Sequence, residues 1–258
     1  MYLQILIGLL LPLFGTILGA ACVFFMRNNL GSGARKVISG FAAGVMIAAS
    51  VWSLLIPAME YESSRALGRL AFLPAALGLW CGIFFLLLSH RLLSSVDESK
   101  LLHKAKRSFG DNTMLVLSVT LHNLPEGMAV GVAYAAYLAN PSGEALGGAL
   151  ALSLGIAIQN FPEGAIISMP LRADGRSRAK AFFCGVASGL VEPVGACLTL
   201  LAISVVLPIL PYLLGFAAGA MIYAVISELM PTLSDSPIGV LSFSAGFCVM
   251  MMLDIAFG

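Results

Sequence analysis

Charged residues are scarce in this sequence of 258 residues, where they make up 10% of the chain against 59% hydrophobic residues. An ordinary soluble domain carries roughly 25% charged residues. The formal net charge is only +1, so no excess of positive charge indicates a nucleic-acid partner. These proportions exclude an ordinary soluble domain and predict a polytopic protein that lies in a lipid bilayer.

Cysteine is also sparse. The five cysteines stand singly in apolar runs and form no C-x-x-C pair. Neither a zinc knuckle nor a disulfide framework is indicated, and we expect these residues to be buried apolar side chains. Basic residues are missing ahead of the first apolar run, which continues to about Met26, so we expect a spanning helix there and no cleavable signal peptide.

Apolar runs of about 20 residues, the length that spans a bilayer, occur eight times. They fall near residues 3–26, 37–59, 71–90, 114–138, 146–170, 181–207, 208–230 and 237–253. We therefore predict an all-α integral membrane protein with eight transmembrane helices, forming one domain over residues 1–258. The boundary between the sixth and seventh helices depends on Pro208 and Pro211 alone.

Basic residues are distributed unevenly between the loops. Twelve Lys and Arg residues follow odd-numbered helices, whereas only Arg65 and Arg69 follow an even-numbered one. Since Lys and Arg accumulate in cytoplasmic loops, both termini are predicted to be extracytoplasmic, with the protein in the plasma (inner) membrane. The longest connection, at about 94–113, is then a cytoplasmic loop, and its one histidine, His103, favours a solvated connector over a metal-sensing segment.

An internal repeat bears on the topology. The octapeptide at residues 40–47, GFAAGVMI, reappears at residues 215–222 as GFAAGAMI. The first copy lies in the second predicted helix and the second in the seventh, so the copies cross the membrane in opposite directions. This is typical of an inverted repeat, and it predicts a 3+2+3 arrangement around the fourth and fifth helices.

The central pair of helices carries two related hexapeptides, HNLPEG at residues 122–127 and QNFPEG at residues 159–164. Residues three and four apart share one face of a helix, so each Glu lies beside both of the polar residues that open its hexapeptide. Pro125 and Pro162 each remove a backbone hydrogen bond and release a carbonyl oxygen. Such disruption at membrane depth is tolerated where the backbone lines a cavity or packs on protein.

Buried carboxylates supply the chemistry. Glu126, Glu163 and Glu192 lie near the centres of their helices, and together they would cost on the order of 10 kcal/mol if uncompensated. No Lys or Arg lies inside the predicted helices, so protons or bound cations must offset their charge. Carboxylates, imidazole and amides without thiolate suit zinc, iron(II), manganese, cobalt or cadmium better than copper(I) or magnesium.

Because each central Glu faces both an i−4 and an i−3 neighbour, the spacing predicts two adjacent metal sites that share carboxylates. The first site would use His122, Glu126, Gln159 and Glu163. The second would use Asn123, Asn160 and Glu192 together with the shared Glu126 and Glu163. The bound metal would be a transported substrate, with no resident cofactor.

The motifs H-N-x-P-E-G and Q-N-x-P-E-G in consecutive helices resemble the signature of the ZIP (Zrt/Irt-like) divalent-metal transporters, and within them the bacterial GufA-like branch. The resemblance implies import of zinc or a similar ion toward the cytoplasm, a paired metal centre, and a homodimer. Asn160 departs from relatives that carry Asp at this position. A neutral amide there should weaken the second site.

Two other functions would also use buried glutamate or histidine side chains. A proton-coupled carrier of an organic solute would use the glutamates as proton relays. An intramembrane metalloprotease would need H-E-x-x-H, but Asn123 holds the position of the catalytic base and Glu126 that of the second His. Glu60 and Glu228, near the ends of their helices, are candidates for collecting or releasing metal at the mouths of a path, or are ordinary interfacial carboxylates.

Overall fold

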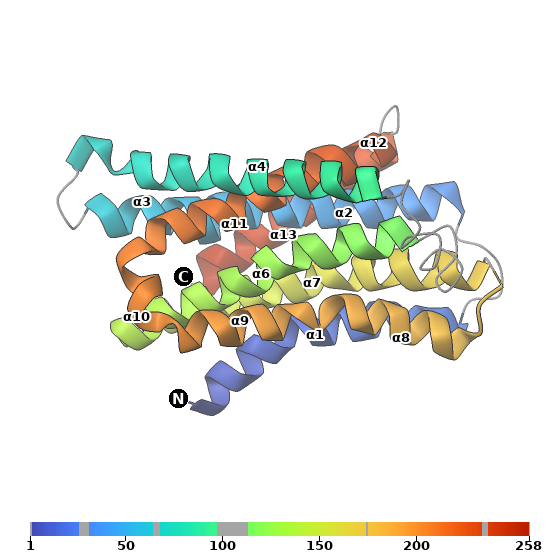
Figure 1. Cartoon of the computed structure of the whole chain (residues 1–258), viewed down its shortest axis with the longest axis horizontal. Coiled ribbons are helices and arrows are strands. Elements are labelled where there is room, and N and C mark those ends of the chain that lie inside the picture. The colour runs from blue at the N-terminus through green and yellow to red at the C-terminus, as the bar shows by residue number, and fades with distance from the viewer. Residues whose placement is uncertain are drawn as a thin grey trace.

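The structure, a computed structural model, describes residues 2–25, 31–63, 68–96, 113–173, 175–233 and 237–257. Within these ranges a few side chains, including that of His122, fall outside the description. Every regular element of the described part is helical, as predicted (Figure 1). The elements are α1 (Tyr2–Phe25), α2 (Ser32–Ala49), η1 (Ser50–Leu55), α3 (Ile56–Ser63), η2 (Gly68–Leu70), α4 (Phe72–Val96), α6 (Thr113–Ala139), α7 (Gly143–Ala173), α8 (Arg178–Gly189), α9 (Val191–Leu201), α10 (Ile203–Val206), η3 (Leu207–Ile209), α11 (Leu210–Ala224), η4 (Val225–Leu229), α12 (Met230–Leu233) and α13 (Pro237–Phe257).

Seven helical stretches of the described chain are long and apolar enough to cross a membrane. They are Tyr2–Phe25, Ser32–Tyr61, Gly68–Leu92, Gly143–Ala173, Arg178–Leu201, Ile203–Leu233 and Pro237–Ala256. The fourth predicted segment is occupied by α6, a helix of 27 residues. The prediction of an all-helical protein with membrane-spanning helices is thus confirmed. The predicted loop lies largely at residues 97–112, including His103, which are outside the described residues.

The sixth spanning stretch ends earlier than predicted. The sequence suggested a boundary between residues 207 and 208, whereas the helix breaks at Ala202, whose backbone angles (φ −94°, ψ 22°) are no longer helical. The two prolines that suggested the boundary lie in first turns, Pro208 in η3 and Pro211 in α11. A first turn tolerates proline because its N–H groups have no partner within the helix. These prolines therefore begin new helical segments and do not end the old one.

Both copies of the octapeptide lie in helices that run in opposite directions, α2 and α11 (Figure 1). In each copy a π-helical segment begins ten residues after the first glycine, at Ser50 in η1 and at Val225 in η4. A π-turn inserts one residue into the helix and is often found at functional sites. The two copies therefore share a distortion as well as a sequence.

The octapeptide helices also pack in the same manner. The carbonyl oxygen of Phe41 in α2 lies against Gly246 of α13, and that of Phe216 in α11 lies against Gly82 of α4. In both places a Cβ on the glycine would overlap the oxygen. Small residues that let backbones approach in this way are typical of helix packing in membranes. The pairs α2–α13 and α4–α11 are thus built alike.

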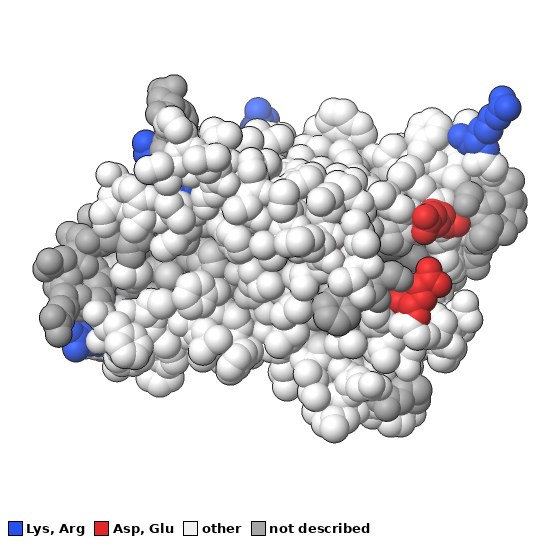
Figure 2. Space-filling model, turned by 180° about the vertical axis from the view of Figure 1, so that it is seen from behind, with Lys and Arg blue, Asp and Glu red and all other residues white. Residues whose placement is uncertain are grey.

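The prediction that the cysteines are buried is wrong. Cys81, Cys197 and Cys248 are exposed, and Cys22 and Cys184 are half-buried. The physical reason is that an apolar side chain of a spanning helix is stable against lipid as well as against protein, so hydrophobicity does not predict burial. A broad uncharged surface is visible in Figure 2, where the acidic side chains in view gather toward the right-hand end.

Candidate metal centre

The two hexapeptides lie inside α6 and α7, and both helices continue through their prolines. The predicted site residues with described side chains are almost fully withdrawn from the surface. The relative exposure is 0% for Asn123, Glu126, Gln159 and Asn160, 4% for Glu163 and 1% for Glu192. The backbone of His122 is part of α6, but its side chain lies outside the described residues.

Glu126 and Gln159 connect the two central helices. Gln159 Nε2 donates a hydrogen bond of 2.6 Å to Glu126 Oε1. The other amide atom, Gln159 Oε1, is buried and accepts no hydrogen bond from the described residues. Rotating the amide by 180° would turn this oxygen toward Glu126, so that a cation between the two side chains would have two oxygen ligands.

Glu192, in the first turn of α9, is held by amides from both hexapeptides. Asn123 Nδ2 lies 3.1 Å from Glu192 Oε1, and Asn160 Nδ2 donates to Glu192 Oε2 over 2.7 Å. Hydrogen bonds to a carboxylate are stronger than those between neutral groups. Because Asn123 and Asn160 come from different helices, their bonds fix α9 against both α6 and α7.

The first helix completes this cluster. Thr16 Oγ1 lies 3.5 Å from Glu192 Oε1, and Asn160 Nδ2 lies 3.3 Å from the carbonyl oxygen of Pro12. Pro12 and Thr16 were not predicted as site residues from the sequence. A weak signal was present, since Thr16 is the only Ser or Thr in α1. Glu192 therefore stands where α1, α6, α7 and α9 meet.

Close backbone contacts allow α1, α6, α7 and α9 to approach one another around Glu192. A Cβ at Gly127, which ends the first hexapeptide, would overlap the backbone of Glu192. A Cβ at Gly164, which ends the second, would overlap the carbonyl oxygen of Thr16. The glycine of each motif thus brings its helix to the partner that carries the next polar group of the cluster. Pro193, which follows Glu192, cannot donate to the carbonyl of Gly189, and α8 and α9 are separated there.

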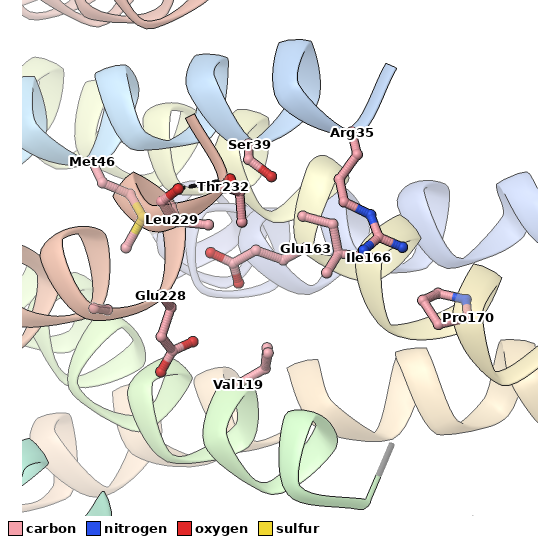
Figure 3. A pocket seen from close by; sticks show the side chains of 11 residues that line it. Arg35, Ser39, Met46, Val119, Glu163, Ile166, Pro170, Glu228, Leu229 and Thr232 are labelled. Carbon is pink, nitrogen blue, oxygen red and sulfur yellow. Dashed lines mark hydrogen bonds between the residues drawn. The ribbon is translucent and has the colours of Figure 1, made fainter. Parts of the chain in front are cut away.

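The side chain of Glu163 points into a cavity. Its carboxylate reaches into a cavity of about 210 Å³ between α2, α7 and the α11–α12 region, where Glu228 also presents its carboxylate (Figure 3). Arg35 and Ser39 of α2 line the same cavity. The structure therefore brings Glu126 to Gln159 and Glu192 to the two asparagines, and it places Glu163 on the wall of a separate space.

Two further polar contacts lie at corresponding places in the octapeptide helices. Ser53 Oγ in η1 donates to Asp254 Oδ1 over 2.7 Å, and His90 Nε2 lies 3.1 Å from Glu228 Oε1 in η4. Ser53 and Glu228 are the fourth residues of their π-helical segments. Glu228 was predicted from the sequence as a candidate residue, but its contact with His90 was not, because residues 138 apart give no local signal.

Asp254 and His90 correspond as well, since each follows by eight residues the glycine that packs on an octapeptide phenylalanine. The pair of Ser53 and Asp254 lines a cavity of about 490 Å³ together with Glu60 and Glu144. Glu60 and Glu228 thus lie on the walls of two different cavities.

The described residues hold no group of three or more His, Cys, Asp or Glu side chains arranged to bind a metal ion. Oxygen ligands from amides are nevertheless present. Asn123 Oδ1, Gln159 Oε1 and Asn160 Oδ1 are buried and have no hydrogen-bond partner among the described residues. Burying such an oxygen without a partner is unfavourable, and a bound cation would remove that penalty. The donor set, mixed oxygen ligands without thiolate, suits a borderline or hard divalent ion.

Comparison with known proteins relates this arrangement to one family. A family model described as "ZIP Zinc transporter" matches residues 97–254. A protein named Zinc transporter ZIP11 from Xenopus tropicalis is 36% identical over 99% of this chain and 98% of its own length. Zinc transporter GufA from Myxococcus xanthus is 37% identical, with 98% of both chains covered. Zinc transporter ZIPB from Bordetella bronchiseptica is 35% identical over 94% of this chain and 78% of its own.

Proposed function

Because the chain belongs to the ZIP zinc transporter family, in its GufA-like branch, we propose that it imports divalent transition metal ions, zinc foremost, toward the cytoplasm. The chain is a transporter and not an enzyme, so the metalloprotease alternative is set aside. The observation that carries the proposal is the burial of three glutamates and three amides on the neighbouring helices α6, α7 and α9. Such a set of ligands would bind a cation within the membrane-spanning part of the protein.

The first metal site of this proposal uses Glu126, Gln159 and Glu163 with His122. The contact between Gln159 and Glu126 supports it, because a rotation of one amide converts that contact into a pair of ligands. Glu163 lies one turn after Gln159 on α7 and borders a cavity, so it connects the first site with a space through which an ion can leave.

The second metal site uses Asn123, Asn160 and Glu192 with the shared Glu126 and Glu163. Here the amides direct N–H groups at Glu192, so both would have to rotate before a metal could bind. The first site requires one such rotation. We therefore assign transport to the first site and a weaker, auxiliary role to the second. Cadmium, iron(II), manganese and cobalt are expected to bind the same mixed ligands.

The architecture of this proposal is a single domain of eight transmembrane helices in a 3+2+3 inverted repeat. The repeated octapeptide, the two π-helical segments and the similar pairs α2–α13 and α4–α11 support it. The beginning of α1 and the end of α13 both lie toward the left-hand side in Figure 1, as an even number of crossings requires. From the charge bias we infer that both termini lie outside the cytoplasm, with the protein in the plasma (inner) membrane, and from the family resemblance we expect a homodimer.

The ion path runs between the two cavities. The cavity with Glu60 and Asp254 lies on the side of the chain ends and forms the external mouth. The cavity with Glu163 and Glu228 is the internal mouth, since it is lined by Arg35, which lies in the first turn of α2 at the end that the charge bias assigns to the cytoplasm. Glu60 and Glu228 would concentrate the ion at these mouths. Both cavities border the central helices, where inverted-repeat transporters hold their substrates.

The test is uptake of zinc and cadmium into proteoliposomes that contain a metal-sensitive dye. Wild-type protein is expected to give saturable uptake, and Glu163→Ala to abolish it. Ser153→Ala is a matched control on α7, because this buried hydroxyl donates to the carbonyl oxygen of Ala149 in its own helix and belongs to neither hexapeptide. If folded wild-type protein moves no divalent metal but carries an organic solute with protons, the competing carrier function is correct.

A further inference from the structure

A third cavity lies beside the central helices. It is a groove of about 470 Å³ between α6, α7 and α8. Lys180, Cys184 and Ser188 line it at intervals of four residues, so they form one face of α8, and Arg176 lines it from the turn before this helix. Over the eight residues from Lys180 to Ser188 a helix rises by roughly 12 Å, so the groove follows α8 for more than a third of a typical hydrocarbon layer.

The groove is charged at one end and apolar along its length. Arg176 and Lys180 mark the charged end, and none of the described residues that line the groove is acidic. The side chain of Phe183 on its wall is 66% exposed. The hydroxyls that line it are satisfied internally, since Thr120 donates to the carbonyl of Val116 and Ser188 to that of Gly185.

We propose that this groove binds an anionic phospholipid, with the phosphate at Arg176 and Lys180 and one acyl chain along Phe183 and Ala187. The charge complements a lipid phosphate, and the exposed apolar wall complements a hydrocarbon chain. Basic pockets between transmembrane helices on the cytoplasmic side are known to accommodate anionic lipid headgroups. The charged end belongs to a loop that the charge bias places in the cytoplasm, next to the leaflet that carries anionic lipids.

A lipid bound in this groove would stabilise the metal centre through its contact with α8. The far end of the groove is Ser188, whose carbonyl oxygen accepts a hydrogen bond of 3.2 Å from Asn123 Nδ2. The same amide holds Glu192. An acyl chain that packs against Ser188 and Ala187 therefore supports the contact between α6 and α8 on which the orientation of Asn123 depends. Lipid binding itself does not rest on the transport proposal.

The experiment measures lipid retention by the purified full-length protein in detergent, without metal, using native mass spectrometry. The probes are phosphatidylglycerol, phosphatidylcholine with the same acyl chains, and glycerol phosphate as a soluble headgroup. Wild-type protein is expected to retain phosphatidylglycerol in preference to phosphatidylcholine, and glycerol phosphate at the same concentration is expected not to displace it. Loss of each basic residue near a membrane surface should weaken retention about fivefold.

The variant Arg176→Gln/Lys180→Gln should therefore lose roughly 25-fold in affinity for phosphatidylglycerol. The matched control is Lys36→Gln/Arg178→Gln, which removes equal charge outside the groove lining and should retain the lipid. A second variant, Ala187→Phe, fills the apolar wall without changing charge and should weaken both phospholipids. Equal retention of the two phospholipids by wild-type protein would overturn the proposal, as would equal loss in the control. Displacement by glycerol phosphate would instead indicate a site for free phosphate and would also overturn it.

Discussion

Replacing Asn160 by Asp tests the arrangement around Glu192 most directly. In the structure Asn160 Nδ2 donates to Glu192 Oε2 over 2.7 Å. An Asp side chain has nearly the same shape but offers only acceptor oxygens, so the donor is replaced by a second negative charge. The substitution therefore changes the electrostatics of the cluster with little change in packing.

The size of the effect follows from two contributions. A hydrogen bond to a charged group contributes about 1.5–3 kcal/mol, and this is lost. Two unit charges about 4 Å apart repel each other by about 4 kcal/mol at an effective dielectric constant of 20. The metal-free variant should thus be less stable by roughly 6 kcal/mol when both carboxylates are ionised. A divalent cation between the carboxylates would reverse the repulsion.

The assay is thermal unfolding in detergent, with a chelator and with increasing cadmium, at neutral pH. Asn160→Asp should melt well below wild type in the chelator and should gain more from cadmium than wild type does. Asn160→Leu is the matched control, because it loses the same hydrogen bond without adding charge and should gain nothing extra from cadmium. An Asp variant as stable as wild type in the chelator, or one that gains no more than the Leu variant, would refute the reasoning.

Three other predictions follow from the structure. Gly127→Ala should lower the melting temperature, with a cost of about 1–3 kcal/mol, because its Cβ would overlap the backbone of Glu192, whereas Gly143→Ala, with open space around it in the described structure, should not. Glu228→Gln should slow zinc uptake, because it removes the negative charge that faces His90 and the cavity, while cadmium affinity at the central cluster, measured by calorimetry, should stay within twofold of wild type. Cadmium affinity should be lower at pH 5.5 than at pH 7.5, since protons compete with the metal for the carboxylates and imidazole; an affinity independent of pH would contradict carboxylate ligation.

The sequence predicted the helices and the central hexapeptides because both depend on local patterns. A lipid-length apolar run predicts a helix whatever it packs against, and the i, i+3 and i+4 spacing places Asn123 beside Glu126 on one helix face. The repeat of residues 40–47 at 215–222 was equally plain. These features require no knowledge of tertiary packing.

The partners of Glu192 could not be predicted in this way. Thr16 and Pro12 reach the cluster only because α1 packs on α7, where Gly15 and Gly19 lie against backbone carbonyl oxygens. Nothing in the spacing of residues in α1 indicates which helix those glycines face. The same holds for the orientation of the amides, which depends on which neighbour offers a donor and which an acceptor.

The π-helical segments and the helix boundary were missed for a different reason. A π-turn needs only one inserted residue, and no residue type marks it. At Ala202 the helix ends without a proline or glycine, while the nearby prolines begin the next segments. Composition therefore suggested a boundary several residues too late.

The corresponding pairs Ser53–Asp254 and His90–Glu228 have a consequence for how such a protein distinguishes its two sides. A backbone whose halves are alike and inverted has no head or tail, just as a rod with identical ends has none. The preferred direction of ion transport must then depend on side chains that differ at corresponding positions of the two halves. A hydroxyl facing a carboxylate at one end and an imidazole facing a carboxylate at the other is such a difference. If the inverted repeat holds, such differences in side chains, and not the path of the backbone, set the side of the membrane on which an ion is released.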